Sequence, residues 1–155
     1  MLPKSIHVKT IKEVANDFHA RYSAKKRLYR YIIKEGESNP FENDYITFLD
    51  NVDYETIKKN IKLFRGDFDF KYFMKSGSDI NYTCRTIFKT LAYKHNGYIV
   101  LNFEANGFLR SQIRLMVGAL LTLNSSEILE QLECKKNHKI KPAKCNGLYL
   151  AKITY

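Results

Sequence analysis

The chain has 155 residues, with 26 lysines and arginines against 16 aspartates and glutamates, so its formal net charge is +10. The length is that of one domain, and a hydrophobic content of 45% with 11 tyrosines and 10 phenylalanines excludes a disordered chain. No apolar run is long enough for a membrane span and no signal-peptide core is present, so we expect a cytoplasmic protein. The positive charge predicts a polyanionic partner, and RNA or DNA is favoured over a membrane surface.

The first half of the chain predicts two strands and a helix. Ser5–Lys9 alternates between polar and apolar residues, as a strand does, and Arg27–Lys34 is rich in the aromatic and β-branched residues that strands favour. Between them, Asp17–Ala24 has no clear period and predicts an ordered loop. Apolar residues at helical spacing predict a helix over Asp53–Phe64, with Asp53 as its N-cap.

The middle of the chain predicts a loop, a hairpin and a long helix. Lys71–Asn81 is polar and has the composition of a loop. Cys84–Lys94 and Tyr98–Glu104 predict the two strands of a hairpin, because an Asn-Gly pair lies between them. The apolar stretch Asn106–Leu121 predicts the long helix.

The last part of the chain predicts a short helix over Ser125–Cys134, capped by Ser125 or Ser126, and a final strand over Leu148–Thr154. A lysine-rich connector, Lys135–Lys144, joins them. The whole order, β-β-α-β-β-α-α-β, predicts a single α+β domain over residues 1–155 with a mainly antiparallel sheet and helices packed on one face.

Arg114 lies within the apolar helix that follows the hairpin. Helical spacing puts Arg110 on the same face, and the sequence contains no Asp or Glu between Asn106 and Leu123. A buried guanidinium without a partner is strongly unfavourable, so a carboxylate or phosphate from elsewhere should reach Arg114. The alternative is that Arg114 extends its charged end to the surface over an apolar stem.

Basic and aromatic residues alternate between Phe18 and Tyr31. The RNA-binding candidates here are His19, Arg21, Lys25, Lys26 and Tyr29, since cations contact phosphates and flat rings stack on bases. The alternative for the two lysines is a solvated edge strand, and that for Tyr29 is packing within the sheet.

Metal and cofactor motifs are missing from the sequence. Cys134, His138 and Cys145 fit no common zinc spacing and lack a fourth ligand, so we expect no metal site. Three cysteines without a paired spacing predict reduced thiols. There is no glycine-rich phosphate loop and no nucleophile elbow, which leaves no cofactor to expect.

Four blocks together resemble the C-terminal domain of the bacterial tRNA pseudouridine synthase A family, which isomerises uridines at positions 38 to 40 of the anticodon stem-loop. The first block, Phe18–Tyr31, resembles the family's F-H-A-R and Y-x-Y pattern. The others are Arg85-Thr86-Ile87, the stretch from Asn106-Gly107-Phe108-Leu109-Arg110 through Arg114 to Gly118, and Gly147-Leu148-Tyr149-Leu150. They occur in the family's order and cover nearly the whole chain.

The resemblance implies a role for several residues. Arg114 matches the arginine that pairs with the catalytic aspartate, Tyr29 the tyrosine that stacks on the target uracil, and Leu148 a leucine of the same pocket. Arg21 and Arg110 match positions that contact the RNA backbone. The implied partner is tRNA, the implied assembly is a homodimer, and no cofactor is implied.

The family's nucleophilic aspartate lies in a G-R-T-D-A-G block of a preceding N-terminal domain, and this sequence contains no such block. We therefore expect the chain to be the C-terminal half of a larger synthase, inactive alone. The alternatives are a non-catalytic RNA-binding module and a structural or dimerisation domain with an incidental basic surface.

Overall fold

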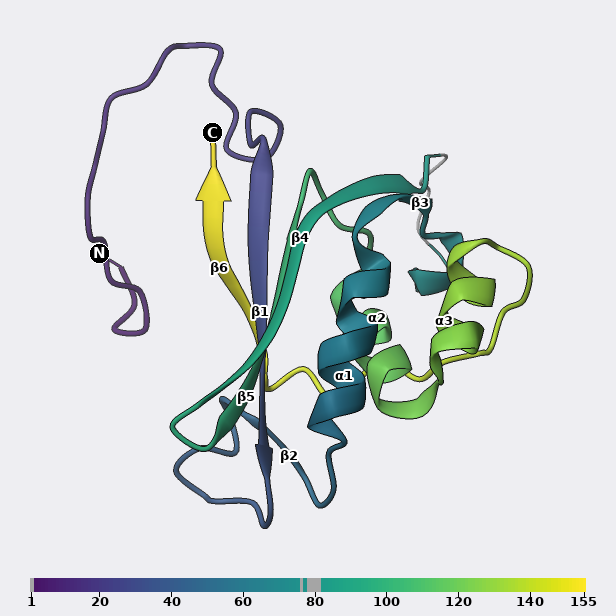
Figure 1. The fold of residues 1–155 in the computed structure, drawn as a ribbon. Helices are drawn as coiled ribbons and strands as arrows, with labels where there is room; N and C mark the ends of the chain where they lie inside the picture. Colours follow the sequence, from purple (N-terminus) through teal and green to yellow (C-terminus); the bar gives the residue numbers. More distant parts are fainter. Residues whose placement is uncertain (1, 76, 78–81) are drawn as a thin grey trace.

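A computed structural model describes residues 2–75, 77 and 82–155. Within them, helices cover one face of a mixed sheet (Figure 1). The strands are β1 (Lys26–Glu35), β2 (Thr47–Leu49), β3 (Gly66–Asp69), β4 (Cys84–His95), β5 (Tyr98–Ala105) and β6 (Leu148–Thr154). The α-helices are α1 (Tyr54–Asn60), α2 (Gln112–Thr122) and α3 (Ser125–Leu132), with short 3-10 helices at Ile61–Phe64 and Lys71–Phe73.

The sheet is organised around β1, which is hydrogen-bonded along both edges. On one edge it pairs with β5, and the sheet continues through β4 to β3, all antiparallel. On the other edge, residues 26–31 pair with antiparallel β6 and residues 33–35 pair with parallel β2. The predicted α+β class with a mainly antiparallel sheet is therefore confirmed.

The hairpin and the first helix agree with the sequence prediction. Asn96 and Gly97 join β4 to β5 with φ angles of 47° and 81°, the left-handed geometry that an Asn-Gly turn favours. The Asp53 carboxylate caps α1 by accepting the Thr56 backbone N–H at 3.0 Å. The helix narrows to a 3-10 turn over Ile61–Phe64.

The strand predicted at Ser5–Lys9 is wrong. The structure has no regular secondary structure there, and Ile6 and Val8 are exposed. Figure 1 shows the N-terminal segment as a long loop beside the sheet. A strand forms only where another strand accepts its backbone hydrogen bonds, and no strand among the described residues pairs with this segment. In contrast, β2 and β3 were not predicted from the sequence, because three or four residues are too few to show the alternation of polar and apolar residues in a strand.

The helix predicted from Asn106 begins only at Gln112, so Arg110 does not share a helical face with Arg114. The Gln112 side chain accepts the Leu109 N–H at 2.8 Å, which closes a turn ahead of the helix, and Ser111 adopts a left-handed φ of 63°. The spacing of apolar residues in the sequence does not show this turn, so it could not predict where the helix begins.

The cap predicted for the next helix is also wrong by one residue. Asn124, rather than Ser125 or Ser126, caps α3 by accepting the Glu127 N–H at 3.0 Å, while the Glu127 carboxylate accepts the Asn124 N–H at 2.9 Å. Of the loop predicted over Lys71–Asn81, the first three residues form a 3-10 turn, and residues 76 and 78–81 lie outside the described part of the chain.

The hydrophobic core lies between the sheet and the helices. Tyr31 and Ile33 of β1 and Leu101 and Phe103 of β5 point into it, because alternate residues of a strand share a face. Along α2, eight residues are buried and Arg114 is half-buried. Arg114 therefore lies at the boundary of the hydrophobic core.

Gly147 lies where β6 and β2 meet along β1. Its carbonyl accepts the Ile32 N–H at 2.9 Å, and a Cβ at this position would come 2.4 Å from the Ile32 carbonyl oxygen. Backbone approaches that close admit only glycine. The glycine of the Gly147–Leu150 block thus lets β6 dock with Leu148 opposite Tyr31.

We predict that Gly147→Ala lowers the free energy of unfolding by about 1–3 kcal/mol, because the added methyl forces β6 away from β1. Urea denaturation measures the loss. Gly107→Ala is the matched control, since its Cβ would meet its nearest neighbour at an ordinary 3.6 Å. Equal stability of Gly147→Ala and the unchanged chain would contradict this account of the close approach.

Candidate functional site

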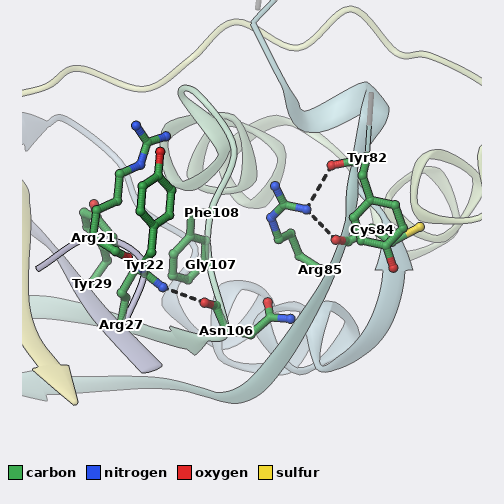
Figure 2. Close-up of a pocket in the computed structure, with 10 residues that line it drawn as sticks. All are labelled: Arg21, Tyr22, Arg27, Tyr29, Tyr82, Cys84, Arg85, Asn106, Gly107 and Phe108. Carbon is green, nitrogen blue, oxygen red and sulfur yellow. Dashed lines mark hydrogen bonds between the residues drawn. The ribbon is translucent and has the colours of Figure 1, made fainter. Parts of the chain in front are cut away.

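A pocket of about 540 Å³ opens where β1 and β4 begin and the segment after β5 crosses between them (Figure 2). Its volume lies in the range of ligand sites, about 300–1,000 Å³. Its lining combines arginines and aromatic rings and contains no carboxylate: Arg21, Tyr22, Arg27, Tyr29, Tyr82, Cys84, Arg85, Asn106, Gly107 and Phe108. We call this the β1–β4 pocket. Its composition suits an anionic, planar ligand.

Tyr29 stands at the wall of the β1–β4 pocket and is half-buried. Its ring meets the Phe108 ring edge to face, with centroids 5.2 Å apart and an interplanar angle of 86°. Both rings pack against the hydrophobic core on one side. The Tyr29 side chain therefore packs against the core and also lines the pocket.

Arg27 joins the two loops that flank Tyr29. Its guanidinium donates hydrogen bonds to the carbonyls of Ala24 at 3.2 Å and Asn106 at 2.7 Å, and also to the carbonyl of Arg21. One side chain thus ties the segment before β1 to the segment after β5. This clamp shapes the pocket around Tyr29 and Phe108.

Arg85 lies across the pocket from Tyr29, near the start of β4 (Figure 2). Its Nη1 donates to the carbonyls of Tyr82 at 3.0 Å and Cys84 at 2.6 Å. Its Nε lies 3.6 Å from the position that a Cβ on Gly107 would take. Among the residues that the structure describes, only backbone carbonyls accept hydrogen bonds from this guanidinium.

Arg114 lines a second pocket, of about 330 Å³, beside Ser111, Leu115 and Ile140. Its Nε donates to the Ala143 carbonyl at 2.6 Å, and its own carbonyl accepts the Ala143 N–H at 2.9 Å. These two bonds fasten the connector before β6 to α2. The Nε bond thereby fixes the guanidinium at the end of the side-chain stem.

Gly118 allows the connector to lie this close to α2. A Cβ on Gly118 would come 2.2 Å from the Lys141 carbonyl oxygen, so no larger residue fits without moving the backbone. The glycine one turn below Arg114 therefore controls how the connector meets the arginine.

No carboxylate among residues 2–75, 77 and 82–155 forms an ion pair with Arg114 within 4.0 Å. The charge of Arg114 instead affects the pKa of a buried tyrosine, Tyr31. Burial raises the pKa of the Tyr31 hydroxyl, while a hydrogen bond with Thr47 and the nearby charge of Arg114 oppose that rise. The half-buried position and the Ala143 bond leave open whether a carboxylate or phosphate from elsewhere meets Arg114, because no described side chain neutralises its charge.

Of the other predicted residues, only Arg21 lines one of these two pockets among the described residues. Leu148 is half-buried and pairs with Tyr31 across β1 and β6. Arg21 lines the β1–β4 pocket. His19, Lys25, Lys26 and Arg110 are exposed and line neither pocket.

Local contacts order part of this basic segment. The His19 Nδ1 accepts the backbone N–H groups of Arg21 and Tyr22, and the Lys26 ammonium lies 5.2 Å from the centroid of the Phe88 ring. His19 therefore stabilises the turn that presents Arg21 to the pocket.

Sequence reasoning missed Arg27, Tyr82 and Phe108 as pocket residues. The chain separates them by dozens of positions, so only strand pairing brings them together. Arg85 carried a signal in its Arg-Thr-Ile block, but nothing in the sequence placed it opposite Tyr29.

Comparison with known proteins places the chain in a family. A family model for tRNA pseudouridine synthase matches residues 61–155. This chain belongs to the tRNA pseudouridine synthase A family, a family of isomerases that modify RNA. The matched part contains β4, α2 and β6, which carry Arg85, Arg114 and Leu148.

Curated relatives carry the same family name. The tRNA pseudouridine synthase A of Campylobacter jejuni strain RM1221 is 40% identical over 157 residues, covering 97% of this chain and 65% of the relative. That of Wolinella succinogenes is 37% identical, covering 97% and 61%. That of Streptococcus mutans is 36% identical, covering 99% and 66%. The chain thus spans less than two thirds of the length of the Campylobacter and Wolinella synthases.

Among the described residues of this synthase family member, no helix has the length and apolar character needed to cross a membrane. The same residues contain no group of three or more His, Cys, Asp or Glu side chains placed to hold a metal ion. Cys84, Cys134 and Cys145 are free thiols, and burial raises the pKa of Cys134.

We predict that Tyr29 and Phe108 stabilise one another by about 0.5–1.5 kcal/mol, the range for an edge-to-face pair. A double-mutant cycle with Tyr29→Leu and Phe108→Leu, measured by urea unfolding, gives this coupling energy. The control cycle combines Tyr29→Leu with Leu129→Ala, an exposed residue of α3, and should be additive within about 0.5 kcal/mol. Additivity of the first cycle would show that the ring contact contributes nothing.

Proposed function

We propose that this chain supplies the tRNA-binding surface and part of the active site of a synthase that isomerises uridine to pseudouridine at positions 38 to 40 of the anticodon stem-loop. One observation carries the proposal. Arg114 is half-buried, is fastened to the Ala143 carbonyl, and has no carboxylate partner among the described residues. An arginine so placed is suited to receive a carboxylate from outside.

The catalytic aspartate comes from a domain outside these 155 residues. The share of the Campylobacter synthase that this chain covers, 65%, leaves room for such a domain. Arg114 would hold the aspartate ionised and oriented, because an adjacent cation favours the charged form of a carboxyl group. The aspartate carboxylate then attacks C1′ of the ribose as the N1–C1′ bond breaks. The released uracil turns, its C5 bonds to C1′ as the carboxylate leaves, N1 takes up a proton, and the C5 proton passes to solvent.

The target nucleotide flips out of the stem-loop and its uracil stacks on Tyr29, with Leu148 on the neighbouring strand β6. The edge contact with Phe108 supports this role, since it holds the Tyr29 ring in a fixed orientation. Tyr29 and Leu148 both lie on the helix-facing side of the sheet, as Tyr31 does.

The exposed arginines and lysines contact the RNA backbone, with the His19 ring beside them. His19, Arg21, Lys25 and Lys26 precede or begin β1, and Arg110 lies just before α2. The net charge of +10 supports attraction of a polyanion to the chain. The synthase acts as a homodimer and needs no cofactor.

The test is tritium release from 5-tritiated uridine in tRNA. The chain is assayed alone and again with the part of the Campylobacter jejuni synthase that it does not match. We expect release only from the mixture, because the aspartate and Arg114 then meet. Release from the chain alone would mean that one of its own carboxylates is the nucleophile.

In the active mixture we predict that Arg114→Ala lowers turnover about 100-fold or more, the order seen when one preorganised electrostatic contact is removed. The affinity for tRNA should change little, since Arg114 meets the aspartate rather than the RNA. Single-turnover tritium release and filter binding separate the two quantities. Lys59→Ala, an exposed charge removal on α1, is the control and should leave both unchanged. A normal rate for Arg114→Ala would refute the assigned role.

A non-catalytic RNA-binding module is the second candidate, favoured by the arginine-rich and carboxylate-free lining of the β1–β4 pocket. Such a module would bind the stem-loop with a steep salt dependence, yet the mixture would release no tritium.

A further inference from the structure

We propose that Arg85 and Tyr82 form a subsite for the nucleotide that adjoins the flipped uridine, with its phosphodiester on Arg85 and its base on Tyr82. The proposal rests on the proposed function, since it takes the β1–β4 pocket to hold RNA. It adds a part of the pocket that the uracil on Tyr29 leaves open.

Arg85 has the geometry of a phosphate-binding residue. Two backbone carbonyls, of Tyr82 and Cys84, occupy its Nη1. The structure records no hydrogen bond from Nε or Nη2 to any residue that it describes, and these atoms belong to the planar fork that binds phosphate oxygens in pairs. The guanidinium is thus oriented in advance and still has donors to offer.

The charges around Arg85 direct an anion into the β1–β4 pocket. Its neighbours there include Arg21 and Arg27 and no carboxylate. On its other side, Asp67 and Asp69 of β3 line an adjacent cavity.

Neither of those carboxylates neutralises Arg85. Asp67 accepts the Thr86 hydroxyl at 2.5 Å, Asp69 accepts the Thr83 hydroxyl at 2.5 Å, and neither forms an ion pair with Arg85 among the described contacts. They would repel a phosphate from the adjacent cavity, so the side of Arg85 that faces Arg27 remains for it.

Tyr82 provides an exposed ring on the side of the β1–β4 pocket that carries Arg85. Its side chain is 69% exposed, while its carbonyl is the group that orients Arg85. Figure 2 shows Tyr82 and Arg85 on the side of the pocket opposite Tyr29, with Gly107 and Phe108 between them. An exposed ring and an oriented guanidinium that line one side of the same pocket suit the base and the phosphate of one nucleotide.

The first experiment measures binding of the 155-residue chain to a fluorescent anticodon stem-loop RNA by anisotropy over a range of salt concentrations. We expect Arg85→Ala to weaken binding about tenfold and to reduce the slope of log affinity against log salt by about 0.7 to 1, because one phosphate contact is lost. Arg85→Lys keeps the charge and should keep the slope. Lys59→Ala is the matched control and should change neither quantity.

A neutral-backbone scan locates the phosphate. Single methylphosphonate linkages are introduced along the loop of the RNA. One linkage next to the target uridine should weaken binding to the unchanged chain but not to Arg85→Ala, since the charge pair is already absent there. If every linkage weakens both proteins equally, Arg85 contacts no phosphate and the subsite is wrong.

Tyr82→Ala should weaken binding about fivefold or more without changing the salt slope, whereas Tyr82→Phe should bind normally, because stacking needs the ring and not the hydroxyl. Normal binding by both Arg85→Ala and Tyr82→Ala would overturn the subsite while leaving the roles of Tyr29 and Arg114 intact. Absence of salt-dependent binding by the unchanged chain would overturn the proposed function together with the subsite.

Discussion

The pairing of β1 along both of its edges is the constraint on which the rest of the structure depends. β5 binds the whole of one edge, and the other edge is divided between β6 and β2. A strand held on both sides cannot shift by one residue, because such a shift would exchange its buried and exposed faces. Tyr29, Tyr31 and Ile33 are therefore kept on the helix-facing side, and the first of them reaches the pocket.

The same strand explains why the two blocks at the ends of the chain lie together. The basic segment that leads into β1 and the Gly147–Leu150 block of β6 are more than a hundred residues apart, yet they meet along one edge. Gly147 permits this meeting because its backbone lies against Ile32. Leu148 is then opposite Tyr31 and near the face that carries Tyr29.

Two arginines are oriented by backbone carbonyls, and no acid in the described part of the chain pairs with either. Arg114 binds Ala143, and Arg85 binds Tyr82 and Cys84. A carbonyl fixes the direction of a guanidinium without cancelling its charge, so each arginine retains its attraction for a further anion. In a family of RNA-modifying enzymes this arrangement suits one arginine to a catalytic carboxylate and the other to the RNA backbone.

The sequence by itself determined the elements that have a strong local signal. These were β1 and β6 from their β-branched and aromatic residues, the hairpin from Asn96-Gly97, and α1 from its spacing and the Asp53 cap. It also marked Arg114 as an unusual charge and indicated the family. Tertiary structure alone decided that Ser5–Lys9 is not a strand and that α2 starts at Gln112, because both depend on hydrogen-bond partners remote from local spacing. It also decided that Arg27, Tyr82, Arg85 and Phe108 share a pocket with Tyr29, since strand pairing, not chain order, determines which side chains meet.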